Sequence, residues 1–187
     1  MAKTALAEKT EAPAEEGVSL ASTRDLSFVG EEFISWLAFR VDTSGSRFEL
    51  PEVGEIFAWI DDRILLRERG VENPAETSLR GGDPMRAKET LAALQGGKIF
   101  ATAKLGIRKG DREWSFGVDS QLSVKGLKLP ALMVDEEDEK FFERVALLEE
   151  FTFILDALFR DFCEIRFVPK WDQSVAPRLR EWIQTGK

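Results

Sequence analysis

The chain has no histidine and no tyrosine, and its 187 residues include a single cysteine, Cys163. Histidine is the commonest general acid–base and metal-binding side chain, so its absence excludes a Ser-His-Asp triad and removes the most frequent metal ligand. One cysteine cannot form an internal disulfide, which fits a reducing compartment. Because Cys163 lies among apolar residues of a predicted helix, we expect a buried structural thiol rather than a nucleophile.

Long apolar runs and catalytic motifs are also missing. No segment approaches the length of a membrane-spanning helix, and the N-terminus has no apolar signal core. We therefore expect a soluble cytoplasmic protein with no membrane partner. The chain has no Gly-x-Ser-x-Gly elbow, no P-loop and no EF-hand loop, so we predict no enzyme and no cofactor or metal. A Ser–Lys arrangement and a metal site at Asp61 and Asp62 stay open, although adjacent aspartates are more typical of a turn.

Charge is unevenly distributed along the chain. Between Lys98 and Lys128, seven basic and three acidic residues give a net charge of +4. Between Asp135 and Glu164, eleven acidic and three basic residues give −8, which equals the formal net charge of the whole chain. Such segregation indicates a binding surface more than a catalytic pocket.

The patterning predicts an α+β fold in one domain, residues 23–187, after a disordered tail, residues 1–22. We expect an amphipathic helix over 28–41, then a hairpin whose turn is Asp61–Arg63, and a loop over 71–83. A helix then begins at Asp83-Pro84 and ends at Gly96-Gly97. Apolar and polar residues alternate over 99–108, 113–119 and 122–128, which predicts an antiparallel meander.

A long helix is predicted from about Glu136 to Glu164, followed by a short closing helix over 175–183. The long helix has a main apolar stripe whose members are three or four residues apart, and a second set of apolar residues widens it. The main stripe holds Phe141, Val145, Leu148, Thr152, Leu155, Phe159 and Phe162, and the second set holds Phe142, Leu147, Phe151, Ile154 and Leu158. A helix with so broad an apolar surface must be well buried or must pack against a second chain. We therefore predict a dimer or another stable complex.

Five basic residues are the candidate binding site. If the apolar members of 99–107 face the core, Lys98, Lys104 and Arg108 point outward, and Arg112 and Lys125 extend that face. Phe100 would lie on the same face and could stack one base. Lysines on a solvent-facing sheet also need no function, because they maintain solubility and discourage edge pairing.

The stretch from Ala87 to about Leu158, somewhat under half the chain, resembles the C-terminal part of RdgC, the bacterial recombination-associated protein family. The resemblance rests on a helix ending at Gly96-Gly97-Lys98 and on a set of strand and helix motifs: Ala103-Lys104-Leu105-Gly106-Ile107, Trp114-Ser115-Phe116, Leu127-Lys128-Leu129, Phe141-Phe142-Glu143-Arg144, Leu147-Leu148-Glu149-Glu150 and Leu155-Asp156-Ala157-Leu158. It implies a dimer that binds duplex DNA in the nucleoid without sequence preference and without enzymatic activity. It also implies that Lys98 and Lys104 contact DNA.

Two functional hypotheses follow, and a third stays open. The favoured one is a non-catalytic, sequence-independent DNA-associated protein of RdgC type that modulates recombination. The alternative is a protein–protein interaction or structural subunit with no nucleic-acid role. The third is an enzyme that uses metal-bound carboxylates around Asp61 and Asp62. A continuous basic sheet face would favour the first, an uncovered apolar stripe on the long helix the second, and converging acids in a pocket the third.

Overall fold

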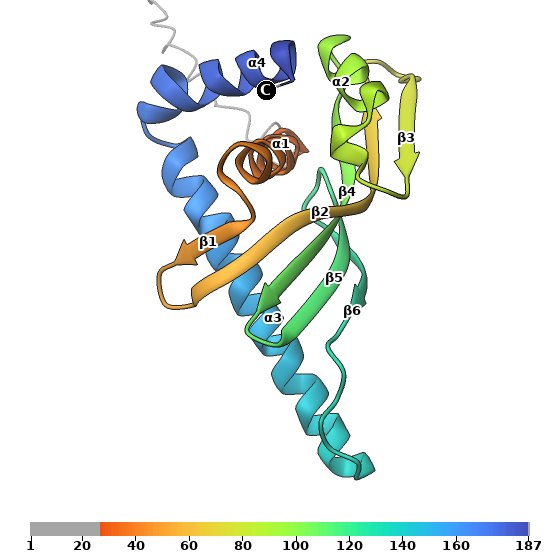
Figure 1. The fold of residues 1–187 in the computed structure, drawn as a ribbon, viewed down its shortest axis with the longest axis vertical. Helices are drawn as coiled ribbons and strands as arrows, with labels where there is room; N and C mark the ends of the chain where they lie inside the picture. Colours follow the sequence, from red (N-terminus) through yellow and green to blue (C-terminus); the bar gives the residue numbers. More distant parts are fainter. Residues whose placement is uncertain (1–26, 187) are drawn as a thin grey trace, which may run out of the picture.

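The computed structural model describes residues 27–186, so the predicted tail over 1–22 lies outside the described residues. Within this range, six strands and four α-helices follow one another (Figure 1): α1 Ser27–Ser44, β1 Arg47–Leu50, β2 Gly54–Arg67, β3 Glu76–Arg80, α2 Lys88–Gln95, β4 Ile99–Lys109, β5 Arg112–Asp119, β6 Val124–Lys128, α3 Glu137–Arg166 and α4 Ala176–Thr185. A 3₁₀ turn, Pro84–Arg86, precedes α2, and one π-helical turn, Trp171–Val175, precedes α4. The predicted α+β class is confirmed.

All strand pairs in the sheet are antiparallel, in the order β1-β2-β4-β5-β6, and β3 pairs with the second half of β2. The predicted meander over β4, β5 and β6 is confirmed. The predicted loop over 71–83 is wrong in part, because Glu76–Arg80 forms strand β3. Its half-exposed, charged sequence carries no apolar alternation that would have marked it as a strand.

The predicted hairpin at Asp61–Arg63 is also wrong. β2 runs without a turn from Gly54 to Arg67 and carries an irregularity between Ile60 and Ile64. Over that interval three residues of β2 lie opposite one residue of β4, Lys104. Two extra residues leave the alternation of faces intact, so Ile60 and Ile64 both point to the core.

Helices α1 and α3 pack on one face of the sheet and bury its apolar side chains (Figure 1). Trp114 and Phe116 of β5 face α3: Trp114 Nε1 donates to the Leu147 carbonyl at 3.3 Å, and the Phe116 and Phe151 rings meet edge to face. Gly30 of α1 lies so close to the end of β5 that a Cβ there would be 2.1 Å from the Ser120 carbonyl oxygen. The helix can therefore approach the sheet only with glycine at this position.

Candidate interaction surfaces

The five predicted basic residues do not form one surface, because β4 contains a bulge. Leu65 pairs with Thr102 and Leu66 with Phe100, so Ala101 is an extra residue on β4. One extra residue reverses the faces of the strand. Phe100 is consequently fully buried in the core, and the prediction that it lies on the polar face is wrong. Lys98 does not share the face of Lys104 either; its Nζ donates to Thr77 Oγ1 of β3 at 2.9 Å.

Arg112 also lies elsewhere than predicted. It shares its face of β5 with the buried Trp114, and its guanidinium donates to Glu150 of α3 at 2.6 Å. Lys109 Nζ donates to the other oxygen of the same carboxylate at 3.1 Å. Burial opposes ionisation of Glu150, but the hydrogen bonds and charges of Arg112 and Lys109 outweigh it, so the pKa of this carboxyl is lowered. These cations fasten the sheet to the helix.

Lys104 lies on the outer face of the sheet, but its ammonium group is paired with two carboxylates. Its Nζ lies 2.9 Å from an oxygen of Asp61 and 2.9 Å from an oxygen of Asp62, because the irregularity in β2 brings both side chains opposite one lysine. The hydrogen bonds from Asp61 and Asp62 raise the pKa of Lys104, and the bond from Lys104 lowers the pKa of Asp62. The two aspartates thus bind an ammonium group, which favours a structural role over metal ligation.

Aromatic side chains cover part of the same outer face. The Trp59 indole lies over Gly106, where a Cβ would be 2.2 Å from its ring atoms, and the Arg108 guanidinium lies 4.9 Å from the centre of the Phe57 ring. Arg108 is therefore exposed at one edge of an aromatic cluster. Spacing along the chain could not predict this patch of Phe57, Trp59 and Arg108, because the patch depends on the pairing of β2 with β4, which sets Phe57 opposite Arg108.

Lys125 lines a groove on the outer face beside Lys104. Two basic residues outside the predicted set, Arg63 and Lys128, line it as well, and its volume is about 410 Å³. Lys125 Nζ is 2.9 Å from Asp119, whose pKa is lowered: burial opposes ionisation, but the hydrogen bonds from Lys125 and from two backbone amides prevail. We call this hollow, lined by Arg63, Lys104, Lys125 and Lys128, the basic groove. At least two of these four cations, Lys104 and Lys125, are already paired with carboxylates.

Helix α3 carries two different apolar stripes. The core stripe packs against the sheet and α1 and is buried: Leu147, Phe151, Ile154, Leu158 and Phe162. The outer stripe has alternating steps of four and three residues and stays partly or largely in solvent: Phe141, Val145, Leu148, Thr152, Leu155 and Phe159. At 100° per residue the two stripes lie roughly 100° apart around the helix. One helix therefore offers two surfaces suited to packing.

The outer stripe is most exposed where α3 leaves the body of the protein. Figure 1 shows the N-terminal end of α3 extending past the sheet. On this arm the side chains of Phe141 and Phe142 are 62% and 70% exposed, and Leu148 is 47% exposed. Single exposed apolar residues are ordinary, but a contiguous set along one helix indicates an interaction surface.

Further along the helix the outer stripe forms one wall of an apolar groove of about 230 Å³. Thr152, Leu155 and Phe159 contribute that wall, and α1 and the β5–β6 connection contribute the rest, including Phe33 and Leu122. The ring centres of Phe33 and Phe159 lie 5.4 Å apart in an edge-to-face contact, so two aromatic rings line the groove. We call this hollow the apolar groove.

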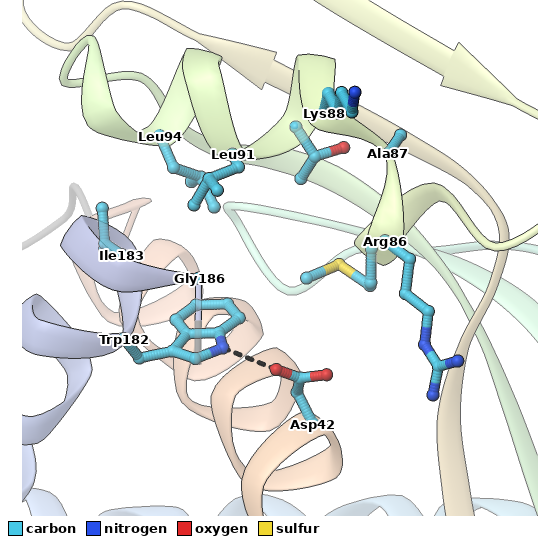
Figure 2. A pocket seen from close by; sticks show the side chains of 11 residues that line it. Asp42, Arg86, Ala87, Lys88, Leu91, Leu94, Trp182, Ile183 and Gly186 are labelled. Atoms are coloured by element: carbon cyan, nitrogen blue, oxygen red, sulfur yellow. Dashed lines mark hydrogen bonds between the residues drawn. The ribbon is translucent and has the colours of Figure 1, made fainter.

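A further hollow, of about 340 Å³, lies between α2 and α4 (Figure 2). Trp182 of α4 projects toward it and donates from Nε1 to Asp42 of α1 at 2.7 Å. Leu91 and Leu94 of α2 form the apolar side. Gln95 Nε2 donates to the Gln184 carbonyl at 2.8 Å, so the contacts around this hollow join the C-terminal helix to α1 and α2.

Within residues 27–186, no group of three or more Cys, Asp or Glu side chains is placed to hold a metal ion. No helix in that range is both long and apolar enough to cross a bilayer. Neither a protein-family model nor a curated protein matches this chain. The resemblance to RdgC, and the DNA-binding role it implies, therefore stay predictions.

Proposed function

We propose that this protein is a non-catalytic interaction protein that works as a homodimer, held together by the outer stripe of α3. The observation that carries the proposal is the exposure of Phe141, Val145 and Leu148 on an arm that extends beyond the sheet. A lone surface helix needs only one apolar stripe, and α3 already has its core stripe. A second stripe with steps of three and four residues is the pattern by which helices pack against other helices.

The distribution of polar contacts supports this proposal over a catalytic role. The carboxylates that sequence analysis left open for chemistry, Asp61 and Asp62, both bind Lys104. Glu150 binds Arg112 and Lys109, and thereby fixes α3 to the sheet. The charged groups of these two clusters are used to hold strands and helix in place.

Light scattering during gel filtration tests the proposal. At tens of micromolar, an ordinary range for interface affinities, the wild-type protein is expected to elute with twice the mass of one chain. Val145→Glu places a charge in the outer stripe and is expected to give a monomer. The matched control is Phe153→Glu, which removes an apolar side chain that is also exposed but lies off the stripe. A monomeric wild type, or equal effects of the two variants, would refute the proposal.

A second candidate function is sequence-independent DNA binding, as the resemblance to RdgC implies. The specific observation in its favour is the basic groove, where Arg63, Lys104, Lys125 and Lys128 converge on one hollow of the outer sheet face. Phosphate contacts of this kind attract nucleic acid without reading its sequence. The carboxylates beside Lys104 and Lys125 reduce the attraction, so we place this function second.

Fluorescence anisotropy with a labelled duplex at low salt tests the second candidate. Binding is expected to be weak, and Lys128→Ala is expected to lower the slope of log affinity against log salt by about one. Lys170→Ala, at an exposed lysine outside the groove, should leave the slope unchanged. Absence of binding at low salt, where the electrostatic attraction is largest, would exclude this function.

A further inference from the structure

The spacing of the outer stripe specifies how a second copy would lie against it. From Phe141 to Phe159 the steps are four, three, four, three and four residues, a series that reads the same in both directions. Its midpoint is at Glu150. A helix turned end for end about that point therefore places every member of the stripe opposite another member: Phe141 opposite Phe159, Val145 opposite Leu155, and Leu148 opposite Thr152.

We infer that two copies pair their α3 helices antiparallel about a two-fold axis near residue 150. This inference rests on the proposed homodimer and adds its geometry. The stripe from Phe141 to Phe159 is about 27 Å long at the rise of an α-helix. An isologous contact of this kind uses the same surface of both copies and closes on itself.

The antiparallel arrangement also gives the exposed arm a place to bind. Phe141 of one copy would lie against Phe159 of the other, which forms the wall of the apolar groove. The most exposed part of the stripe would thus meet the region where the partner offers an apolar hollow bounded by Phe33 and Leu122. A parallel pair would instead set arm against arm and leave both apolar grooves empty.

Charge favours the same orientation. The helix begins beside five consecutive carboxylates, Asp135 to Glu139. In a parallel pair these runs would lie next to each other and repel. In the antiparallel pair each run lies opposite residues 161–165, which carry only two carboxylates, Asp161 and Glu164, so the repulsion is smaller than between two runs of five. Antiparallel helix dipoles add to the preference.

Disulfide cross-linking tests this geometry in a Cys163→Ser background. The double variant Val145→Cys, Leu155→Cys is expected to form a covalent dimer on mild oxidation, read on a non-reducing gel with the linked peptides identified by mass spectrometry. Its two positions lie about 15 Å apart along one helix, too far for a disulfide within one chain. Val145→Cys alone should stay uncrosslinked, as should the off-stripe pair Ala146→Cys, Phe153→Cys. Thermal melting checks that each variant folds.

The results distinguish failure of the antiparallel pairing from failure of the proposed homodimer. Cross-linking of the double variant alone supports the antiparallel pair. Cross-linking of Val145→Cys by itself would show a parallel pair and overturn this inference while leaving the homodimer. A dimer by light scattering that cross-links in no variant would overturn it as well. A wild type that is monomeric by light scattering would overturn the inference and the proposed function together.

Discussion

The two stripes of α3 are similar in composition and differ in what covers them. The core stripe holds Leu147, Phe151, Ile154, Leu158 and Phe162, and the sheet and α1 bury it. The outer stripe is also rich in Phe, Leu and Val, but four of its members are more than a third exposed: Phe141, Val145, Leu148 and Thr152. Apolar content therefore does not tell the stripes apart; the position of the sheet does. The fold of one chain buries the first stripe, but it leaves the N-terminal part of the second stripe, from Phe141 to Thr152, exposed.

The largest effect is expected on the free energy of unfolding, from substitutions that remove the sheet side chains packed against the core stripe. Phe116→Ala removes a ring packed edge to face on Phe151, and Trp114→Ala removes a fully buried indole that also donates a hydrogen bond to Leu147. Each is expected to lower the free energy of unfolding by about 3–5 kcal/mol. Phe153→Ala, at an exposed ring on α3, should change it by less than about 0.5 kcal/mol. Urea unfolding followed by tryptophan fluorescence measures all three, and a neutral effect of Phe116→Ala would contradict the packing described.

A smaller effect is expected on the outer side, and on association rather than folding. Phe141→Ala removes much of the apolar surface of the arm and should raise the dimer dissociation constant by about ten- to a hundred-fold. At protein concentrations below the dimer dissociation constant, the free energy of unfolding of the monomer should be the same for the variant and the wild type. Sedimentation equilibrium gives the constant. Equal dissociation constants for the variant and the wild type would show that the arm lies outside the interface.

The smallest effect is expected from the ion pairs that hold α3 to the sheet. The pKa of Glu150 is lowered in the folded protein, because bonds from Arg112 and Lys109 outweigh the effect of burial. A lowered pKa stabilises the fold above the pKa of the unfolded chain, and this contribution is lost as pH falls through the folded pKa. Glu150→Gln should therefore lower stability at pH 7 by about 1 kcal/mol or less. The difference from wild type should shrink in acid. A difference that grows as pH falls would contradict the assigned direction.

Periodicity predicted the elements with strong apolar patterns. Helices α1 and α3 and strands β4 and β5 were expected close to their observed bounds. β3 was missed because its sequence, Glu76–Arg80, has no apolar alternation, and it forms a strand by pairing with the distant part of β2. The turn predicted at Asp61–Arg63 was wrong because these residues bulge opposite Lys104 and do not reverse the chain. In both cases the outcome depends on pairing between strands that are far apart in the sequence, and local sequence patterns do not predict that pairing.

The candidate sites were predicted less well than the fold, for a related reason. One extra residue at Ala101 reverses the faces of β4, which removes Lys98 from the expected basic surface and buries Phe100. The sequence showed both sets of apolar residues on α3 but did not indicate which set faces the sheet. The stripe with regular three-four steps is the outer one. Which stripe is buried depends on the angle at which the helix meets the sheet, and the spacing of residues along the helix does not determine that angle.

The reaction rate of a thiol placed on the outer stripe of α3 measures whether a second copy covers that stripe in solution. Thr152 lies on the stripe near its midpoint, and Ala146 is exposed on another side of the helix. In a Cys163→Ser background, Thr152→Cys is expected to react slowly with a maleimide at high protein concentration and faster on dilution. Ala146→Cys should react fast at both. Equal rates for the two thiols at every concentration would show that the outer stripe is uncovered and that the proposed homodimer does not form through it.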